Sequence, residues 1–146
     1  MKKKTLFAVI SWAAVAVCMG IIFFLSAQNG SESSSTSGKL MQLIELLKLP
    51  LTESFVRNAA HFSEFALLAV LIFNAVYQSC SRRRPFLSLT LAAAYAAADE
   101  FHQLFVEERV CSPLDWLIDC SGAACGIIIG ILIMYILSYL KRGKTN

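Results

Sequence analysis

Four long apolar runs constrain this chain more than any other feature of its sequence. They cover residues 5–25, 55–77, 86–105 and 116–140. Each run is near or above the ~20 residues that an α-helix needs to cross the hydrocarbon core of a bilayer. Because 57% of the 146 residues are hydrophobic and only 16% are charged, the chain is far more apolar than an average soluble domain. We therefore predict one all-α membrane domain, a polytopic bundle of four transmembrane helices in the lipid bilayer.

Signals at the helix ends refine these limits. Ser112-Pro113-Leu114-Asp115 supplies an N-cap, a proline at the first helical position and an acid at the third, so we expect the fourth span at 113–140. Residues 78–85 form the predicted internal loop, in which three arginines precede a proline. Residues 28–52 form the predicted external loop. It begins with a polar low-complexity stretch and then contains a short apolar helix with one polar stripe, which suits the membrane interface.

Positive charge is concentrated in the segments that would face one side of a four-span bundle. The positive-inside rule assigns that side to the cytoplasm, so we expect a cell-membrane protein with both termini cytoplasmic. The net charge of +3 then reflects membrane topology, and we expect no nucleic-acid partner. The basic residues on this side are Lys2, Lys3, Lys4, Arg82, Arg83, Arg84, Lys141, Arg142 and Lys144.

Small residues predict where the helices pack closely. The alanine-rich third span is expected to be central in the bundle, because small side chains let neighbouring helices approach. Gly122, Gly126 and Gly130 recur at every fourth position of the fourth span. This stripe can face another helix of the same chain or a second copy, so a homo-oligomer stays open. Cys111 and Cys120 both lie toward the outer side, and whether they pair also stays open.

Ionisable and polar residues gather in the outer halves of the predicted helices. Charged groups within a bilayer span are costly and usually face the bundle interior, a partner or water. Glu64 and Asp119 are expected about 10 Å below the outer surface, at 1.5 Å per residue, and Asp99 at a similar depth. The candidate site residues are Gln28, Arg57, His61, Glu64, Asp99, Glu100, His102, Gln103, Arg109, Asp115 and Asp119.

Helical spacing predicts which of these side chains share a face. Asp99 and Gln103 should point together, whereas Glu100 should point elsewhere. Some residues also have a simpler explanation. Arg57 can extend to the headgroups, Asp115 can favour the helix N-terminus, and His61 can be a satisfied interior histidine.

Four motifs stand in a specific order along the chain. They are Phe24-Leu25-Ser26-Ala27-Gln28, Arg57-Asn58-Ala59-Ala60-His61-Phe62-Ser63-Glu64-Phe65, Tyr95-Ala96-Ala97-Ala98-Asp99-Glu100-Phe101-His102-Gln103 followed by Arg109, and Asp115 and Asp119 with Gly122 and Gly126. Together they resemble the VanZ-like family, which is named for a teicoplanin-resistance accessory protein. The resemblance covers most of the chain and implies a four-helix membrane protein, linked in some members to reduced glycopeptide susceptibility. It implies no agreed reaction or ligand.

Three chemistries can use such a polar cluster: anion binding, metal-assisted hydrolysis and proton relay. The chain has no compact metal motif such as His-Glu-x-x-His, so we expect no metal and no other cofactor. Our leading hypothesis is that Arg57 and Arg109 hold an anionic lipid-linked molecule or cell-wall precursor at the outer end, and that the protein modulates teicoplanin susceptibility. The alternatives are an intramembrane hydrolase or transferase that uses carboxylates and histidines, and a purely structural cluster.

Overall fold

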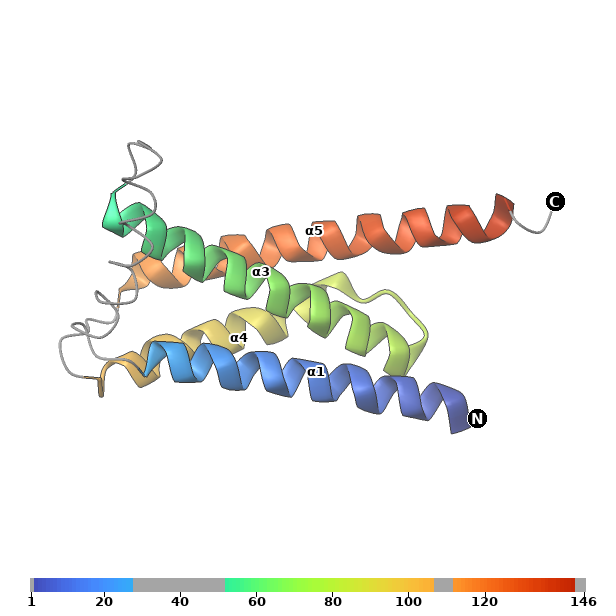
Figure 1. Ribbon diagram of the computed structural model, residues 1–146, viewed down its shortest axis with the longest axis horizontal. Coiled ribbons are helices and arrows are strands. Elements are labelled where there is room, and N and C mark those ends of the chain that lie inside the picture. The colour runs from blue at the N-terminus through green and yellow to red at the C-terminus, as the bar shows by residue number, and fades with distance from the viewer. Residues whose placement is uncertain (1, 28–51, 107–111, 144–146) are drawn as a thin grey trace, which may run out of the picture.

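The fold is a bundle of α-helices that run alternately in opposite directions. The computed structural model describes residues 2–27, 52–106 and 112–143. Within them lie α1 (Lys2–Ser26), α3 (Glu53–Cys80), α4 (Pro85–Gln103) and α5 (Pro113–Gly143), and no strand. The start of α1 and the end of α5 lie at one end of the bundle, here called the terminal end, and α3 and α5 begin at the opposite end, here called the loop end (Figure 1). The all-α prediction is confirmed, whereas the predicted interfacial helix lies outside the described residues.

The prediction of four apolar transmembrane helices is wrong in number. Among the described residues, three helical segments are long and apolar enough to cross a membrane: Lys3–Ser26, Ser54–Cys80 and Pro113–Gly143. The helix α4 is not among them. It has only 19 residues and ends at Gln103, so its polar last turn is a large part of its length, and its many alanines are less apolar than leucine or isoleucine.

The turn between α3 and α4 is tighter than the predicted loop 78–85. The helix α3 continues to Cys80, and Ser81 then adopts a left-handed conformation with φ 54°. Its backbone N–H still donates to the Tyr77 carbonyl at 2.8 Å, which closes the helix as αL caps commonly do. Pro85 stands in the first turn of α4, where its fixed φ favours helix initiation.

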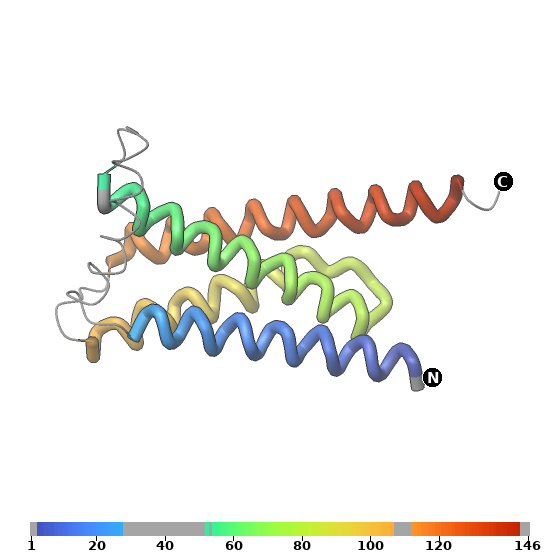
Figure 2. The backbone as a smooth tube through the Cα atoms, in the orientation of Figure 1, coloured from blue at the N-terminus to red at the C-terminus, as the bar shows by residue number. Residues whose placement is uncertain are grey.

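The central helix is α3, which packs against α1, α4 and α5; the tube view shows its course through the bundle (Figure 2). The alanine-rich α4, which we predicted to be central, also contacts the three other helices, but less extensively than α3 does. Large side chains of α3, such as Phe65, Leu68 and Phe73, fill the core. The helix α4 buries only one face of its alanine-rich stretch, with Ala92 and Ala96 fully buried.

The glycine stripe of α5 packs against α3 of the same chain. A Cβ atom added at Gly122 would overlap the Phe62 carbonyl oxygen, and one added at Gly126 would overlap the Ala66 carbonyl oxygen. Tight packing by these glycines is thus confirmed. Since the stripe is covered within the chain, it is not an interface for a second copy.

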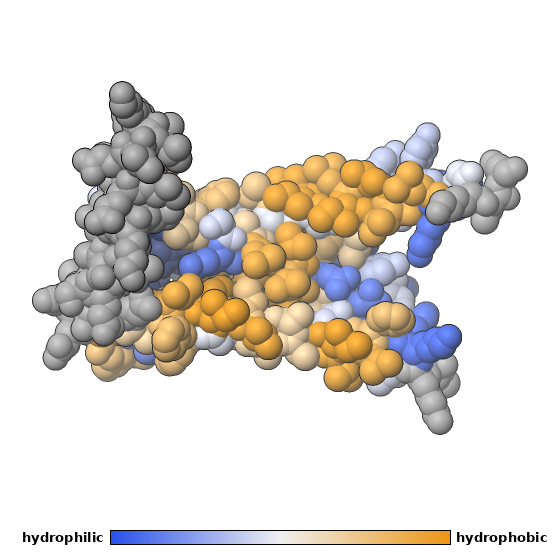
Figure 3. Space-filling view, viewed as in Figure 1, coloured by the Kyte–Doolittle hydropathy of each residue, from blue (hydrophilic) through white to orange (hydrophobic). Residues whose placement is uncertain are grey.

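The outer surface of the bundle is largely apolar. Long side chains of α1 and α5, including Phe7, Phe24, Leu132 and Ile136, are more than half exposed. Figure 3 shows these apolar bands and hydrophilic surface near both ends. Exposed apolar surface of this extent is unusual for a monomeric soluble protein and typical of a helix bundle in lipid.

Candidate functional site

Caps at the loop end set the depth at which the polar side chains of α3 and α5 lie. The Thr52 hydroxyl accepts a hydrogen bond from the Phe55 backbone N–H at 3.2 Å, and the Ser112 hydroxyl accepts one from the Asp115 N–H at 3.4 Å. Each cap fixes the start of its helix. At 1.5 Å per residue, His61 and Asp119 both lie about 10 to 14 Å from these starts, so the two side chains meet.

Besides the packing of the glycine stripe, α3 and α5 make a polar contact between His61 and Asp119. The distance from His61 Nδ1 to Asp119 Oδ1 is 3.4 Å, with the histidine side chain 13% exposed and the aspartate 0% exposed. This is an ion-pair distance, yet the geometry is not that of a hydrogen bond. Within the described residues, neither Asp119 oxygen has a hydrogen-bond donor. A carboxyl group so placed is costly to bury and retains its full capacity to accept hydrogen bonds.

A second pair links α1 to α4. The Ser26 hydroxyl donates to Asp99 Oδ2 at 2.7 Å, and the Gln103 side-chain amide donates to the same oxygen at 3.4 Å. All three side chains are buried. The structure thus brings Asp99 and Gln103 together, as their spacing predicts. Ser26 was not among our candidate residues, although it belongs to the first of the four motifs and directly follows the first apolar run.

The two pairs belong to one cluster at the loop end. The His61 ring lies within electrostatic range of Glu64 and Asp99 as well as Asp119, and Asp119 lies within range of Asp99. All four helices therefore contribute, with Ser26 from α1. We call His61, Glu64, Asp99, Gln103, Asp119 and Ser26 the polar cluster.

Asp115 lies within electrostatic range of Asp119, whereas the other remaining candidate residues lie apart from this cluster or outside the described residues. Glu100 points elsewhere, as expected, and its Oε2 accepts the Ser112 backbone N–H at 3.0 Å, so it helps to fix the start of α5. The His102 ring packs on Phe23 with ring centroids 4.3 Å apart. Arg57 is exposed, and Asp115 is half-buried in the first turn of α5. Gln28 and Arg109 lie outside the described residues.

The cluster is rich in hydrogen-bond acceptors. Its carboxyl oxygens and imidazole nitrogen suit a ligand that brings donors such as hydroxyl, amide or ammonium groups. In the described part of the chain, no three His, Cys, Asp or Glu side chains are arranged to hold a metal ion. Cys120 carries a free thiol, whereas Cys111 is not among the described residues.

The comparisons with known proteins agree with the motifs. No curated protein and no solved structure matches the chain. A family model described as VanZ/LLP1 matches residues 11–137, which cover the described residues of α3 and α4, the polar cluster and most of α1 and α5. The protein is therefore a membrane-type helix bundle that belongs to the VanZ/LLP1 family.

Proposed function

We propose that this protein binds a lipid-linked molecule of the cell envelope at the loop end of its bundle, on the outer side of the cell membrane. The observation that carries the proposal is the state of Asp119, a fully buried carboxyl group whose two oxygens receive no hydrogen bond from the described residues. A purely structural polar group in lipid normally receives a hydrogen bond from a neighbouring helix. The two Asp119 oxygens, which accept no hydrogen bond from the described residues, instead favour a ligand that donates hydrogen bonds to them.

The orientation of the bundle supports an extracytoplasmic site. The basic segments at residues 82–84 and 141–142 lie at the terminal end, which the positive-inside rule assigns to the cytoplasm. The polar cluster then lies in the outer half of the bundle. The start of α1 and the end of α5 lie at one end, and in the proposed topology α4 returns the chain through the membrane with its polar residues Asp99 and Gln103 buried against other helices.

A groove at the loop end, whose lining is separate from the polar cluster, favours a ligand with a lipid part in addition to its polar part. An open, mainly apolar groove with about 300 Å³ of space lies between α4 and α5, and its lining includes Phe101, Leu104 and Trp116. An acyl or polyprenyl chain fits such a groove. Hydroxyl or amide groups of the ligand would donate to the polar cluster, and the exposed Arg57, one turn before His61 on α3, would hold a phosphate or carboxylate.

Binding of a fluorescent lipid-linked cell-wall precursor to the purified protein in nanodiscs tests this proposal. We expect Asp119→Asn to weaken binding about tenfold or more, because hydrogen bonds to a charged group contribute roughly 1.5–3 kcal/mol. Asp115→Asn is the matched control, since it removes the same charge one helical turn away at a half-buried position. Equal affinity of wild type and a folded Asp119→Asn protein would refute the assignment.

We further propose that binding of this molecule modulates teicoplanin susceptibility, which the family resemblance implies for some members. A deletion strain complemented with wild type, Asp119→Asn or Asp115→Asn joins the site to the phenotype. The expected order is that wild type and Asp115→Asn restore the same inhibitory concentration while Asp119→Asn behaves like the deletion. Identical susceptibility of the deletion strain and its three complemented derivatives would refute a role in teicoplanin susceptibility.

A second candidate function is hydrolysis or group transfer on the same ligand. The observation that favours it is the His61–Asp119 contact of 3.4 Å, because an imidazole oriented by a carboxylate is a common general base. Chromatographic analysis of the precursor after incubation with the protein distinguishes the two functions. Product formation that His61→Gln abolishes would support catalysis. Recovery of intact precursor at saturating protein would support binding without catalysis.

A further inference from the structure

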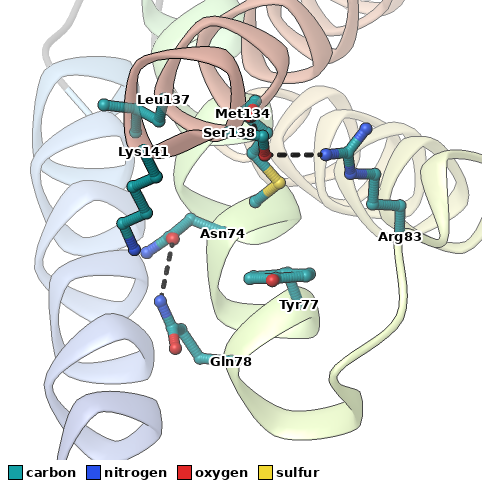
Figure 4. A pocket seen from close by; sticks show the side chains of 8 residues that line it. All are labelled: Asn74, Tyr77, Gln78, Arg83, Met134, Leu137, Ser138 and Lys141. Carbon is teal, nitrogen blue, oxygen red and sulfur yellow. Dashed lines mark hydrogen bonds between the residues drawn. The ribbon is translucent and has the colours of Figure 1, made fainter. Parts of the chain in front are cut away.

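A second polar pocket lies at the terminal end, at the opposite end of the bundle from the polar cluster. It is formed by the last turns of α3, the last turns of α5 and the turn before α4, and it has about 200 Å³ of space. Figure 4 shows Arg83 and Lys141 reaching it from opposite sides, with Asn74, Gln78 and Tyr77 between them. No acidic side chain is among the described residues that line it.

The pocket is rich in hydrogen-bond donors, and hydrogen bonds hold some of its lining side chains in place. The Asn74 amide donates to the Ser11 hydroxyl of α1 at 3.0 Å and accepts from the Gln78 amide at 3.5 Å. Arg83 reaches across from the turn and donates to the Ser138 hydroxyl at 3.4 Å. A guanidinium has five N–H donors, so this long single bond leaves most of them available for a ligand.

The depth of the pocket corresponds to the boundary between lipid and water. On α5, Leu137 and Tyr139 are 54% and 70% exposed, and Lys141 and Arg142 follow in the last turn. A change from apolar and tyrosine side chains to basic ones is typical of a helix leaving the hydrocarbon core. Met134 and Leu137 give the pocket an apolar wall. Its occupant should therefore carry an anion next to an apolar chain.

We propose that this pocket binds the phosphate of an anionic phospholipid headgroup from the leaflet at the terminal end. Arg83 can contact two phosphate oxygens at once, whereas Lys141 acts as a second, point-like cation. The Tyr77 ring and the Met134 side chain lie where the glycerol region would pass. Inorganic phosphate carries the same anionic group but has no apolar part that could contact Met134 and Leu137.

Native mass spectrometry of the full-length protein released from nanodiscs tests the proposal. The nanodiscs contain phosphatidylglycerol or phosphatidylcholine, and the readout is the number of retained lipids. We expect retained phosphatidylglycerol to fall about tenfold in Arg83→Gln/Lys141→Gln, from the loss of charge-assisted hydrogen bonds. The matched control Arg82→Gln/Arg142→Gln removes the same charge from the same turn and helix end without altering the pocket lining, and it should retain the lipid.

The outcomes are distinct. All four substituted side chains are exposed, so folding should survive, and Arg83→Lys should retain more lipid than Arg83→Gln. Equal loss in the control would assign binding to the basic surface in general and overturn the pocket. Retention of phosphatidylcholine at the same level as phosphatidylglycerol would refute selection of an anionic phospholipid. Displacement of the lipid by millimolar inorganic phosphate would overturn the phospholipid as the source of the phosphate.

Discussion

The most direct test of the packing is to add one methyl group at Gly126 of α5. In an ordinary helix, replacing glycine with alanine stabilises by up to about 1 kcal/mol because it reduces backbone freedom. At Gly126 the added Cβ would overlap the Ala66 carbonyl oxygen of α3. The obstacle is backbone, which has no rotamer by which to move away, so α3 and α5 must separate or shift.

The expected cost follows from these opposing effects. Overpacking of a tight contact costs typically 1–3 kcal/mol, and a backbone obstacle belongs at the upper end of that range. After subtraction of the helix-propensity gain, Gly126→Ala should lower the free energy of unfolding by about 2 kcal/mol. Gly20→Ala on α1 is the matched control, because nothing lies within 4 Å of its added Cβ. It should leave stability equal or slightly higher.

Reversible unfolding of the detergent-solubilised protein in sodium dodecyl sulfate, followed by circular dichroism, measures both variants. The two alanine variants should differ by roughly 2–3 kcal/mol, with Gly126→Ala the less stable. Gly122→Ala should resemble Gly126→Ala, since its Cβ would overlap the Phe62 carbonyl oxygen next to His61. A Gly126→Ala protein as stable as Gly20→Ala would refute close packing of these helices.

Three further predictions concern the polar cluster, the topology and the groove. Ser26→Ala removes the 2.7 Å hydrogen bond to Asp99 and should destabilise the protein by about 1–3 kcal/mol in the same assay, whereas Ser121→Ala, whose exposed hydroxyl bonds within its own helix, should have little effect. In single-cysteine proteins in intact cells, an impermeant maleimide should label Phe105→Cys but reach Cys80 only after permeabilisation; labelling of both from one side would contradict a crossing by α4. Trp116→Ala should weaken binding of a long-chain precursor but not of a short-chain analogue, and an equal effect on both would exclude the groove.

The four helices could be predicted from the sequence because long apolar runs and the signals at their ends are local features of the chain. The arrangement of the helices could not. Alanine content favoured α4 as the central helix, but the core depends on which helix offers large side chains on several faces, as Phe65, Leu68 and Phe73 of α3 do. Helical spacing could show that the three glycines of α5 share a face, yet not whether that face meets α3 or a second copy.

The candidate site was only partly predictable for a related reason. Spacing within one helix placed Asp99 beside Gln103 and turned Glu100 away, because both depend only on local geometry. Pairing between helices depends on rotation and depth, which one sequence does not give. Ser26 was therefore not predicted, because the packing of α1 at the level of Asp99 depends on the arrangement of the helices. Arg57 lies outside the polar cluster, at an exposed position of α3.

Hydropathy does not identify α4 as a candidate membrane span, although α4 contributes Asp99 and Gln103 to the polar cluster. Hydropathy adds up residue types without regard to which face they occupy. In α4, Asp99, Glu100 and Gln103 are 4% exposed or less, so the residues that lower its hydropathy do not meet lipid. A helix can therefore enter a bilayer with buried acidic groups if neighbouring helices cover them. Covering them requires α1 and α5 to pack closely around the loop end. The Ser26 hydroxyl of α1 bonds Asp99 directly, and the glycine stripe brings α5 close to α3, so both contribute to this close packing.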